Sequence, residues 1–268
     1  EVGHAVADSP FGPYRFEAIA LKGTGAGTWD RHMIHNPTVL RHGGKYFLYY
    51  TGTNGNANWR EGAPLPSDDD YWFCRNNQRI GVAVADDPAG PWRRFEKPLL
   101  DVSVTGWDTL ITTNPSVAAT PDGRFLMIYK TASPGEKPAG KVVHGVAFAD
   151  NPLGPFKKHP DPIFTHATAE FPAEDPYVWH AGDRYCAIVK DMGGHFTDAG
   201  RSLVLFDSPD GIRWNLADHP LVSTLQIPWA DGPPEKVRNL ERPQLHLEKG
   251  RPAVLFCAAR PETKPEHS

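Results

Sequence analysis

Apolar and polar positions along this chain alternate in short runs that recur with one plan. Four segments each have a polar pair, a proline, an apolar run, a Gly-containing turn and an apolar return run. They begin at His35 (HNPTVLRHGGKYFLYYTGT), Thr113 (TNPSVAATPDGRFLMIYKT), Ala173 (AEDPYVWHAGDRYCAIVKD) and Glu241 (ERPQLHLEKGRPAVLFCAA). Alternation bounded by turn residues is typical of a β-hairpin. One hairpin therefore occurs four times, which is an internal repeat.

A second repeated unit follows three of these hairpins, and one copy of it opens the chain. The copies begin at Val2, Ile80, His144 and, in a looser form, Ser202. The first three each run from an alternating segment into an Asp-x-Pro-x-Gly-Pro turn, and then into an aromatic residue that opens the next strand. Hairpin plus strand pair makes a four-stranded unit of roughly 60 to 80 residues, which is typical of β-propeller blades. We predict an all-β fold, a β-propeller.

The two ends of the repeat leave the number of blades open. No hairpin precedes the opening strand pair, Val2 to Ala20, and no strand pair follows the closing hairpin, Glu241 to Ala258. Either these halves join into one blade of a four-bladed ring, or the ring has five blades and the first is incomplete in this chain. Because one blade cannot bury both its faces alone, we expect residues 1–268 to form a single domain.

Composition excludes several classes of partner. The net charge of −4 argues against nucleic acid, which favours a basic surface. No apolar run approaches the ~18 residues that span a bilayer, so we expect no membrane partner. Cys74, Cys186 and Cys257 lack the spacing of a metal site, and we interpret them as small hydrophobic residues. Compartment and oligomeric state stay open.

Topology places the functional side chains at one mouth of the propeller channel. In a blade whose first strand lines the channel, that strand's start, the end of strand two and the next loop share one face. The polar pairs before each proline should therefore meet Lys130, Lys190 and Asp191 there, under the loop 54–78. Function is expected on this face, because the opposite face has only tight turns. The aromatic residues of that loop, Trp59, Tyr71, Trp72 and Phe73, give it apolar surface for contact with a sugar or with a neighbouring subunit.

Two matching connectors admit both a structural and a functional interpretation. WDRHMIHNP starts at Trp29 and WDTLITTNP at Trp107, each with an Asp six residues before an Asn-Pro. Structurally, the loop staples itself to the blade edge. Functionally, amide and carboxylate groups surround a polar pocket beside a flat Trp, which suits sugars. The side chains concerned are Asp30, His35, Asn36, Asp108 and Asn114.

Carboxylates open two further blades. Glu174, Asp175 and Glu241 stand at strand starts, where a charged side chain facing the channel needs a partner such as Lys190 or Arg242. A structural ion-pair network is one interpretation. The other is glycosidic bond cleavage, which needs one protonated acid and one base or nucleophile. We then expect one of Asp175 and Glu241 to be ionised beside a cation and the other to have a raised pKa.

These motifs resemble the five-bladed β-propeller glycoside hydrolases, and most closely the family 43-like branch of the arabinanase, levansucrase and invertase superfamily. HNPTV, TNPSV, EDPYVW with KDM, and ERPQL, joined to GxAxADxPxGP units, carry the resemblance over essentially the whole chain. It implies a glycosidase that removes a terminal sugar from an oligo- or polysaccharide. Carried over by position, it singles out Asp175, Glu174 and Glu241 as catalytic. We add as candidate substrate-binding residues Asp30, His35, Asn36, Asn114, Lys130, Lys190, Asp191, His195 and Arg242.

The chain departs from this family in two ways. Asn36 and Asn114 stand where related enzymes often have Asp, and members usually begin with one more hairpin that supplies an acidic residue. We therefore expect an incomplete first blade and weak turnover. A glycan-binding propeller without turnover is the alternative, as is a glycoside phosphorylase that uses basic groups such as Arg31 and Arg242 for phosphate. A protein-interaction scaffold is a weaker fit. No cofactor is expected, although a channel-bound Ca²⁺ or Na⁺ ion is compatible with the sequence.

Overall fold

Three four-stranded antiparallel sheets form the greater part of the fold. The computed structural model describes residues 1–25, 27–54, 68–134 and 140–262. Within each of these sheets, strands that follow one another in the sequence are neighbours. The sheets consist of β3 (Met33–His42), β4 (Lys45–Thr53), β5 (Gln78–Ala85) and β6 (Arg93–Arg94); β7 (Thr113–Ala119), β8 (Phe125–Ala132), β9 (Val142–Ala149) and β10 (Lys157–Lys158); and β11 (Ala173–His180), β12 (Tyr185–Asp191), β13 (Ser202–Ser208) and β14 (Asn215–Ser223).

Two smaller sheets stand at the ends of the chain. One pairs β1 (Val2–Val6) with β2 (Arg15–Leu21), and the other contains β15 (Gln226–Ile227), β16 (Glu235–Glu248) and β17 (Arg251–Pro261). No ladder joins these two sheets among the described residues, so the halves do not merge into one blade of a four-bladed ring. The expectation of an all-β propeller is confirmed.

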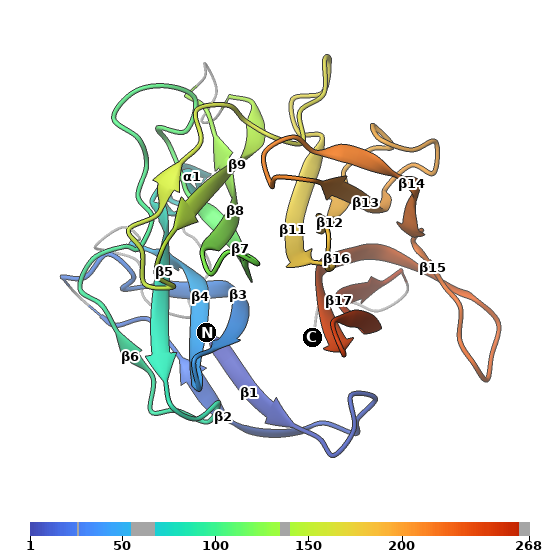
Figure 1. Cartoon of the computed structure of the whole chain (residues 1–268), viewed down its shortest axis with the longest axis horizontal. Coiled ribbons are helices and arrows are strands. Elements are labelled where there is room, and N and C mark those ends of the chain that lie inside the picture. Colours follow the sequence, from blue (N-terminus) through green and yellow to red (C-terminus); the bar gives the residue numbers. More distant parts are fainter. Residues whose placement is uncertain (26, 55–67, 135–139, 263–268) are drawn as a thin grey trace.

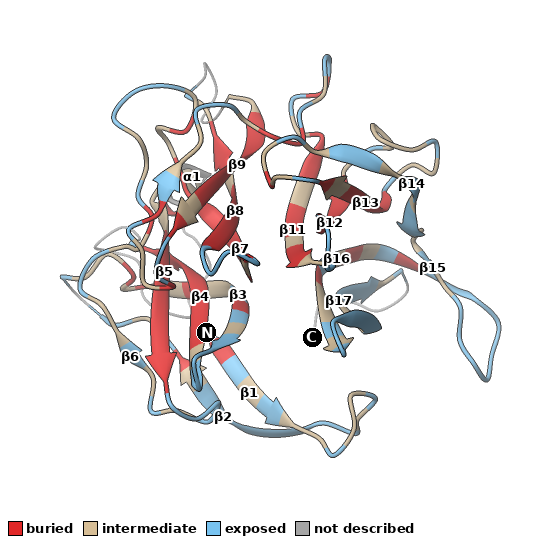
Figure 2. Ribbon diagram, viewed as in Figure 1, coloured by how far each residue is buried: buried red, intermediate tan, exposed pale blue. Residues whose placement is uncertain are grey.

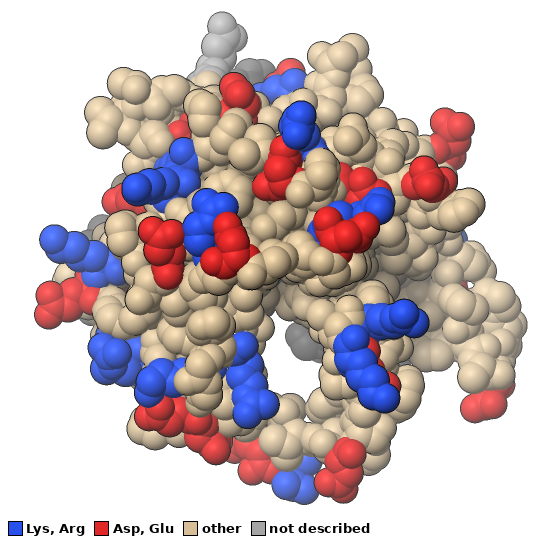
Figure 3. Space-filling view, in the orientation of Figure 1, with Lys and Arg blue, Asp and Glu red and all other residues tan. Residues whose placement is uncertain are grey.

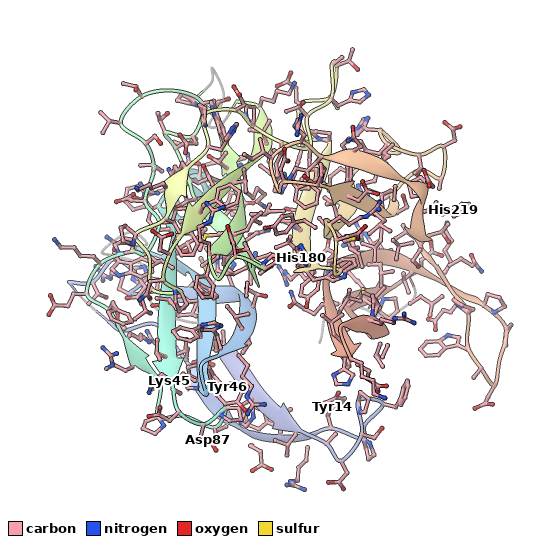
Figure 4. The ribbon with its side chains drawn as sticks, in the orientation of Figure 1. Tyr14, Lys45, Tyr46, Asp87, His180 and His219 are labelled. Atoms are coloured by element: carbon pink, nitrogen blue, oxygen red, sulfur yellow. The ribbon has the colours of Figure 1, made fainter. Side chains whose placement is uncertain are left out.

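The sheets are arranged around a central opening, with β3, β7, β11 and β16 innermost (Figure 1). Each of these strands contacts the next around the ring, from β3 to β7, β7 to β11 and β11 to β16. The surface is open in this view between the β1–β2 sheet and the β15–β17 sheet (Figure 3). Tyr14, on the loop after β1, crosses toward β17 (Figure 4), where its ring meets Phe256 edge-on at 6.2 Å between centroids.

The hydrophobic core is divided among the interfaces between neighbouring sheets. Tyr49 and Val82 of one sheet pack with Met127 and Ala147 of the next, and further clusters fill the other interfaces. The middle strands of the four-stranded sheets are therefore buried, while β2 and β14 are largely exposed (Figure 2). This pattern explains the alternating sequence, because each blade covers the faces of its neighbours.

Short turns close the hairpins at the face away from the long loops, as predicted. Gly43 and Gly44 link β3 to β4 with φ angles of 56° and 78°, and glycine adopts these values without steric cost. Lys45 marks this turn at the start of β4 (Figure 4).

One helix, α1 (Asp68–Asn76), lies in the connection between β4 and β5. The sequence analysis expected only a loop in this connection. No helix in the described part of the chain is long and apolar enough to cross a membrane.

Candidate active site

The four innermost strands share one backbone feature at equivalent positions. Asn36, Asn114, Asp175 and Arg242, each directly before a proline, have φ angles of 48°, 50°, 50° and 52°. The strand register shifts at each of these positions, so every innermost strand carries a bulge. All four residues line the same cavity. We call them the bulge residues.

The amides of two bulge residues form a directed chain that ends on a carboxyl group. Asn36 Nδ2 donates to Asn114 Oδ1 at 2.5 Å, and Asn114 Nδ2 donates to Asp175 Oδ1 at 2.5 Å. Thr113 Oγ1 also donates to Asn114 Oδ1, at 2.8 Å, and the Asn114 backbone N–H donates to Thr51 Oγ1 at 3.0 Å. The two acceptor contacts at Asn114 Oδ1 fix the orientation of its amide, so that its NH₂ group faces Asp175.

Asp175 is the carboxyl group best suited to hold a proton near neutral pH. Its residue is 7% exposed, and burial together with the negative charge of Glu174 raises its pKa to about 6. The carboxyl oxygen Oδ1 accepts from Asn114, which leaves Oδ2 to carry the proton. A protonated carboxyl at the wall of a cavity can act as a general acid.

Two lysines form ion pairs with the neighbouring carboxylates. Lys130 Nζ lies 2.7 Å from Glu174, and Lys190 Nζ contacts both Glu174, at 3.3 Å, and Glu241. Burial alone would raise the pKa of Glu174, but the two ammonium groups outweigh it and lower this pKa to about 2. The Lys190 side chain is only 3% exposed and links Glu174 of β11 to Glu241 of β16.

These groups surround a cavity of about 490 Å³. Its wall combines the bulge residues, three carboxyl groups, three cations and an aromatic surface from α1 and the segment before β11. It is lined by His35, Asn36, Tyr71, Trp72, Arg75, Gln78, Ile111, Asn114, Lys130, Gly140, Val142, Phe171, Glu174, Asp175, Glu241 and Arg242. An aromatic wall beside polar groups suits a sugar ring.

Most of the residues predicted for the site lie together in this cavity. The three candidate catalytic residues line it, as do His35, Asn36, Asn114, Lys130 and Arg242. Burial, reinforced by the charges of Arg242 and Lys130, lowers the pKa of His35 to about 4, so this imidazole is neutral at pH 7. Lys190 lies behind the lining and holds the carboxylates, which differs from its predicted role in binding substrate.

The loop 54–78 was predicted to lie over the mouth, and its described part does. Tyr71 and Trp72 of α1 line the cavity, whereas Phe73 does not. Trp59 lies outside the described residues.

Asp30 was predicted to bind substrate, and the structure corrects this. Asp30 is 2% exposed and accepts hydrogen bonds from Thr24, Tyr50 and Arg94, which ties β4 to β6. Neither Asp30 nor Asp108 lines the cavity.

Asp108 repeats this arrangement in the next blade, where it accepts from Tyr129 at 3.0 Å and from Lys158 at 2.7 Å. Gly81 lies directly against the ring of Tyr50, and Gly145 against that of Tyr129, so neither position has room for a Cβ. The Trp-Asp connectors are therefore staples within the blade, which was the structural interpretation.

Asp191 and His195 were also predicted to contact substrate, and the structure assigns both to the loop after β12. Asp191 is fully buried and accepts the backbone N–H groups of five consecutive residues, 193 to 197. The His195 ring packs against His166, with 5.2 Å between centroids. Neither residue lines the cavity, because Asp191 points back into the loop that it organises.

Arg75 and Phe171 are among the lining residues that the sequence analysis missed. Arg75 follows Tyr71 and Trp72 at helical spacing, and its guanidinium lies over the Trp72 ring at 5.6 Å. Phe171 shortly precedes Glu174, and its ring lies 5.7 Å from Lys130 Nζ. The helical spacing was a signal for Arg75, whereas nothing in the sequence pattern indicated Phe171.

Comparison with known proteins relates the fold to one group of enzymes. No protein-family profile matches the sequence, and no curated protein does. Similar solved structures include Zg3597, a family 117 glycoside hydrolase from the marine bacterium Zobellia galactanivorans (23% identity, TM-score 0.57, 78% of this chain and 52% of that one). Others are fructan 1-exohydrolase IIa from Cichorium intybus (18%, 0.53, 79% and 35%) and RS223 β-xylosidase (17%, 0.57, 81% and 68%).

The chain spans about half of the Zobellia enzyme and about a third of the Cichorium enzyme. At these identities the similarity establishes the fold, and the resemblance inferred from the sequence motifs agrees with it. The chain has the β-propeller fold found in glycoside hydrolases.

Proposed function

We propose that this protein is a glycoside hydrolase that cleaves a terminal sugar from an oligo- or polysaccharide by carboxylate chemistry. The observation that carries the proposal is the pairing of two adjacent carboxyl groups with opposite protonation. Burial raises the pKa of Asp175 to about 6, while the lysines lower that of Glu174 to about 2. Glycosidases need an acid and a carboxylate that differ in this way at one pH.

Each acid has a role that follows from its surroundings. Asp175 protonates the glycosidic oxygen as the bond to the leaving group breaks. Glu241, which is ion-paired and has a side chain 25% exposed, acts as the base or nucleophile. Glu174 stays negative between Lys130 and Lys190 and stabilises the positive charge that develops on the sugar ring.

The test is turnover of a panel of fluorogenic aryl glycosides by the wild-type chain and by three variants. Asp175→Asn and Glu241→Gln should each lower turnover by about 10² or more, with a far smaller change in sugar binding. Glu96→Gln removes an exposed carboxylate outside the cavity and should leave turnover unchanged. In the wild-type chain kcat/KM should fall as the pH rises through about 6, because the acid must be protonated.

A glycan-binding propeller without turnover is the second candidate. The observation that favours it is the pair of amides at Asn36 and Asn114, two of the four bulge positions, where a carboxylate would add catalytic capacity. Tight binding of an oligosaccharide with no turnover of any aryl glycoside, or equal turnover by wild type and both acid variants, would favour this candidate.

A further inference from the structure

The cations that line the cavity fall into two classes. Lys130 forms an ion pair with Glu174, and Lys190 behind the wall pairs with Glu174 and Glu241. Arg75 and Arg242 also line the cavity, but neither forms an ion pair with a carboxylate among the described residues. When Asp175 is protonated, the cavity wall therefore carries an excess of positive charge that its own acids do not neutralise.

Arg75 is held in place for a ligand. Its guanidinium stacks over Trp72 at 5.6 Å, and Nη1 donates to Asn76 Oδ1 at 3.1 Å. These contacts restrict the side chain without supplying a negative charge. Burial lowers the pKa of the Arg75 guanidinium more than Tyr71 and the negative charge of Glu174 raise it, so an anion directly beside it would recover part of the lost hydration energy.

Arg242 has a backbone conformation that arginine does not favour. Its φ angle of 52° is common for Asn but strains the backbone of most other residues. Asn or Asp holds each of the three equivalent bulge positions. Strain of this kind concentrates at functional sites, because side-chain chemistry there outweighs backbone preference.

His35 lines the same cavity as the two arginines. The positive charges of Arg242 and Lys130 both act to keep the His35 imidazole neutral, after the larger effect of burial. A neutral imidazole can donate one hydrogen bond to an oxyanion without adding charge. Arg242 directly follows the acid Glu241 on β16, and its positive charge also acts on Asp175 of β11.

We propose that the cavity recognises an oxyanion through Arg75 and Arg242, so that its ligand is an acidic sugar or a sugar together with free phosphate. The proposal rests on the function given above and narrows its substrate class. A carboxylate, sulfate or phosphate presents two oxygens that match the planar guanidinium fork. If free phosphate is the source, its oxygen forms the bond to the anomeric carbon, the bond to the leaving oxygen breaks, and Asp175 supplies that oxygen with its proton.

The experiment measures binding by calorimetry to the Asp175→Asn variant, which should leave the ligands intact. The probes are methyl glucuronide with methyl glucoside, methyl galacturonide with methyl galactoside, and inorganic phosphate. In at least one pair the charged sugar should bind about tenfold or more tightly, or phosphate itself should bind. This preference should fall about tenfold to a hundredfold with Arg75→Gln or Arg242→Gln added, the loss expected for a charge-assisted hydrogen bond.

Arg41→Gln is the matched control. Arg41 also stacks on an aromatic ring, that of Tyr46 at 5.7 Å, but it does not line the cavity, so binding should not change. The reaction product distinguishes the two sources of the oxyanion, which are an acidic sugar and free phosphate. Release of a sugar phosphate by the wild-type chain in the presence of phosphate identifies free phosphate, and a uronide preference without that product identifies the sugar.

Two results would overturn the inference alone. Equal affinity for the charged and neutral sugars, without phosphate binding, would show that the cavity does not recognise an oxyanion. The glycosidase proposal would then remain intact. A charged-sugar preference that survives both arginine substitutions would have the same consequence. If none of the sugars binds and phosphate does not bind, the inference and the proposed function fail together.

Discussion

Replacing Asp175 by Asn should make the protein more stable at neutral pH while it removes the proposed acid. In the folded chain the pKa of this carboxyl rises from 3.8 to about 6. Each pH unit corresponds to about 1.4 kcal/mol, so the ionised form costs the folded state about 3 kcal/mol. The Asp175→Asn variant would keep the hydrogen bond that Asn114 donates, because the carbonyl oxygen of the new amide can take the place of Oδ1.

The increase in the free energy of unfolding of the Asp175→Asn variant over the wild type should grow as the pH rises. Below pH 3.8 the carboxyl is neutral in the folded and unfolded chains, so it costs nothing. As the pH rises through 3.8 and then 6, the unfolded chain ionises first and the folded state loses stability. The free energy of unfolding of the variant should therefore exceed that of the wild type by about 1 kcal/mol at pH 4.5 and by about 3 kcal/mol at pH 8.

Urea unfolding followed by tryptophan fluorescence measures this difference, since the chain has 8 tryptophans. Asp191→Asn is the control, because it makes the same chemical change at a carboxylate that accepts five backbone N–H groups. An amide there turns an NH₂ group toward N–H donors, so this variant should lose about 2 kcal/mol or more at pH 8. A gain for Asp175→Asn that is equal at both pH values would refute the reasoning, as would a loss at pH 8.

Two further substitutions test the staple and the ion-pair network. Lys190→Met should lower the free energy of unfolding at pH 7 by about 3 kcal/mol, because it leaves Glu241 without its lysine and Glu174 with one. Adding Glu241→Gln should recover part of that loss in urea unfolding, and no recovery would contradict the pairing. Asp30→Asn should lower stability by about 2 to 4 kcal/mol, since Arg94 loses its buried partner, while sugar binding measured by calorimetry stays unchanged. Weakened sugar binding in a folded Asp30→Asn protein would place Asp30 in the site after all.

The fold was predictable because its signals are local. Alternation, glycine turns and the Asp-x-Pro-x-Gly-Pro segments specify hairpins one at a time, and their repetition specifies the propeller. The connection 54–78 was not predictable in the same way. It carries α1 without a repeat to compare it with, and the weakly amphipathic helix has no matching segment elsewhere in the chain.

The site was predictable in position more than in detail. Strand starts identified Glu174, Asp175 and Glu241, and all three line the cavity. The assignment of Asp30 failed because the same Asp-to-Asn spacing serves a staple. A signal for the staple was present in the Tyr50 and Gly81 pair, which lie opposite each other on β4 and β5 and recur in the next blade.

At the bulge residues, the backbone conformation is shared while the side-chain chemistry differs. Four strands offer the same backbone bend to one cavity, yet the side chains there are two amides, one acid and one guanidinium. Exchanging Asn for Asp at such a position changes the charge in the channel while the bend is kept, because both residues tolerate it. The four bulge positions thus allow the charge and hydrogen bonding of the cavity to change while the fold of the blades stays the same.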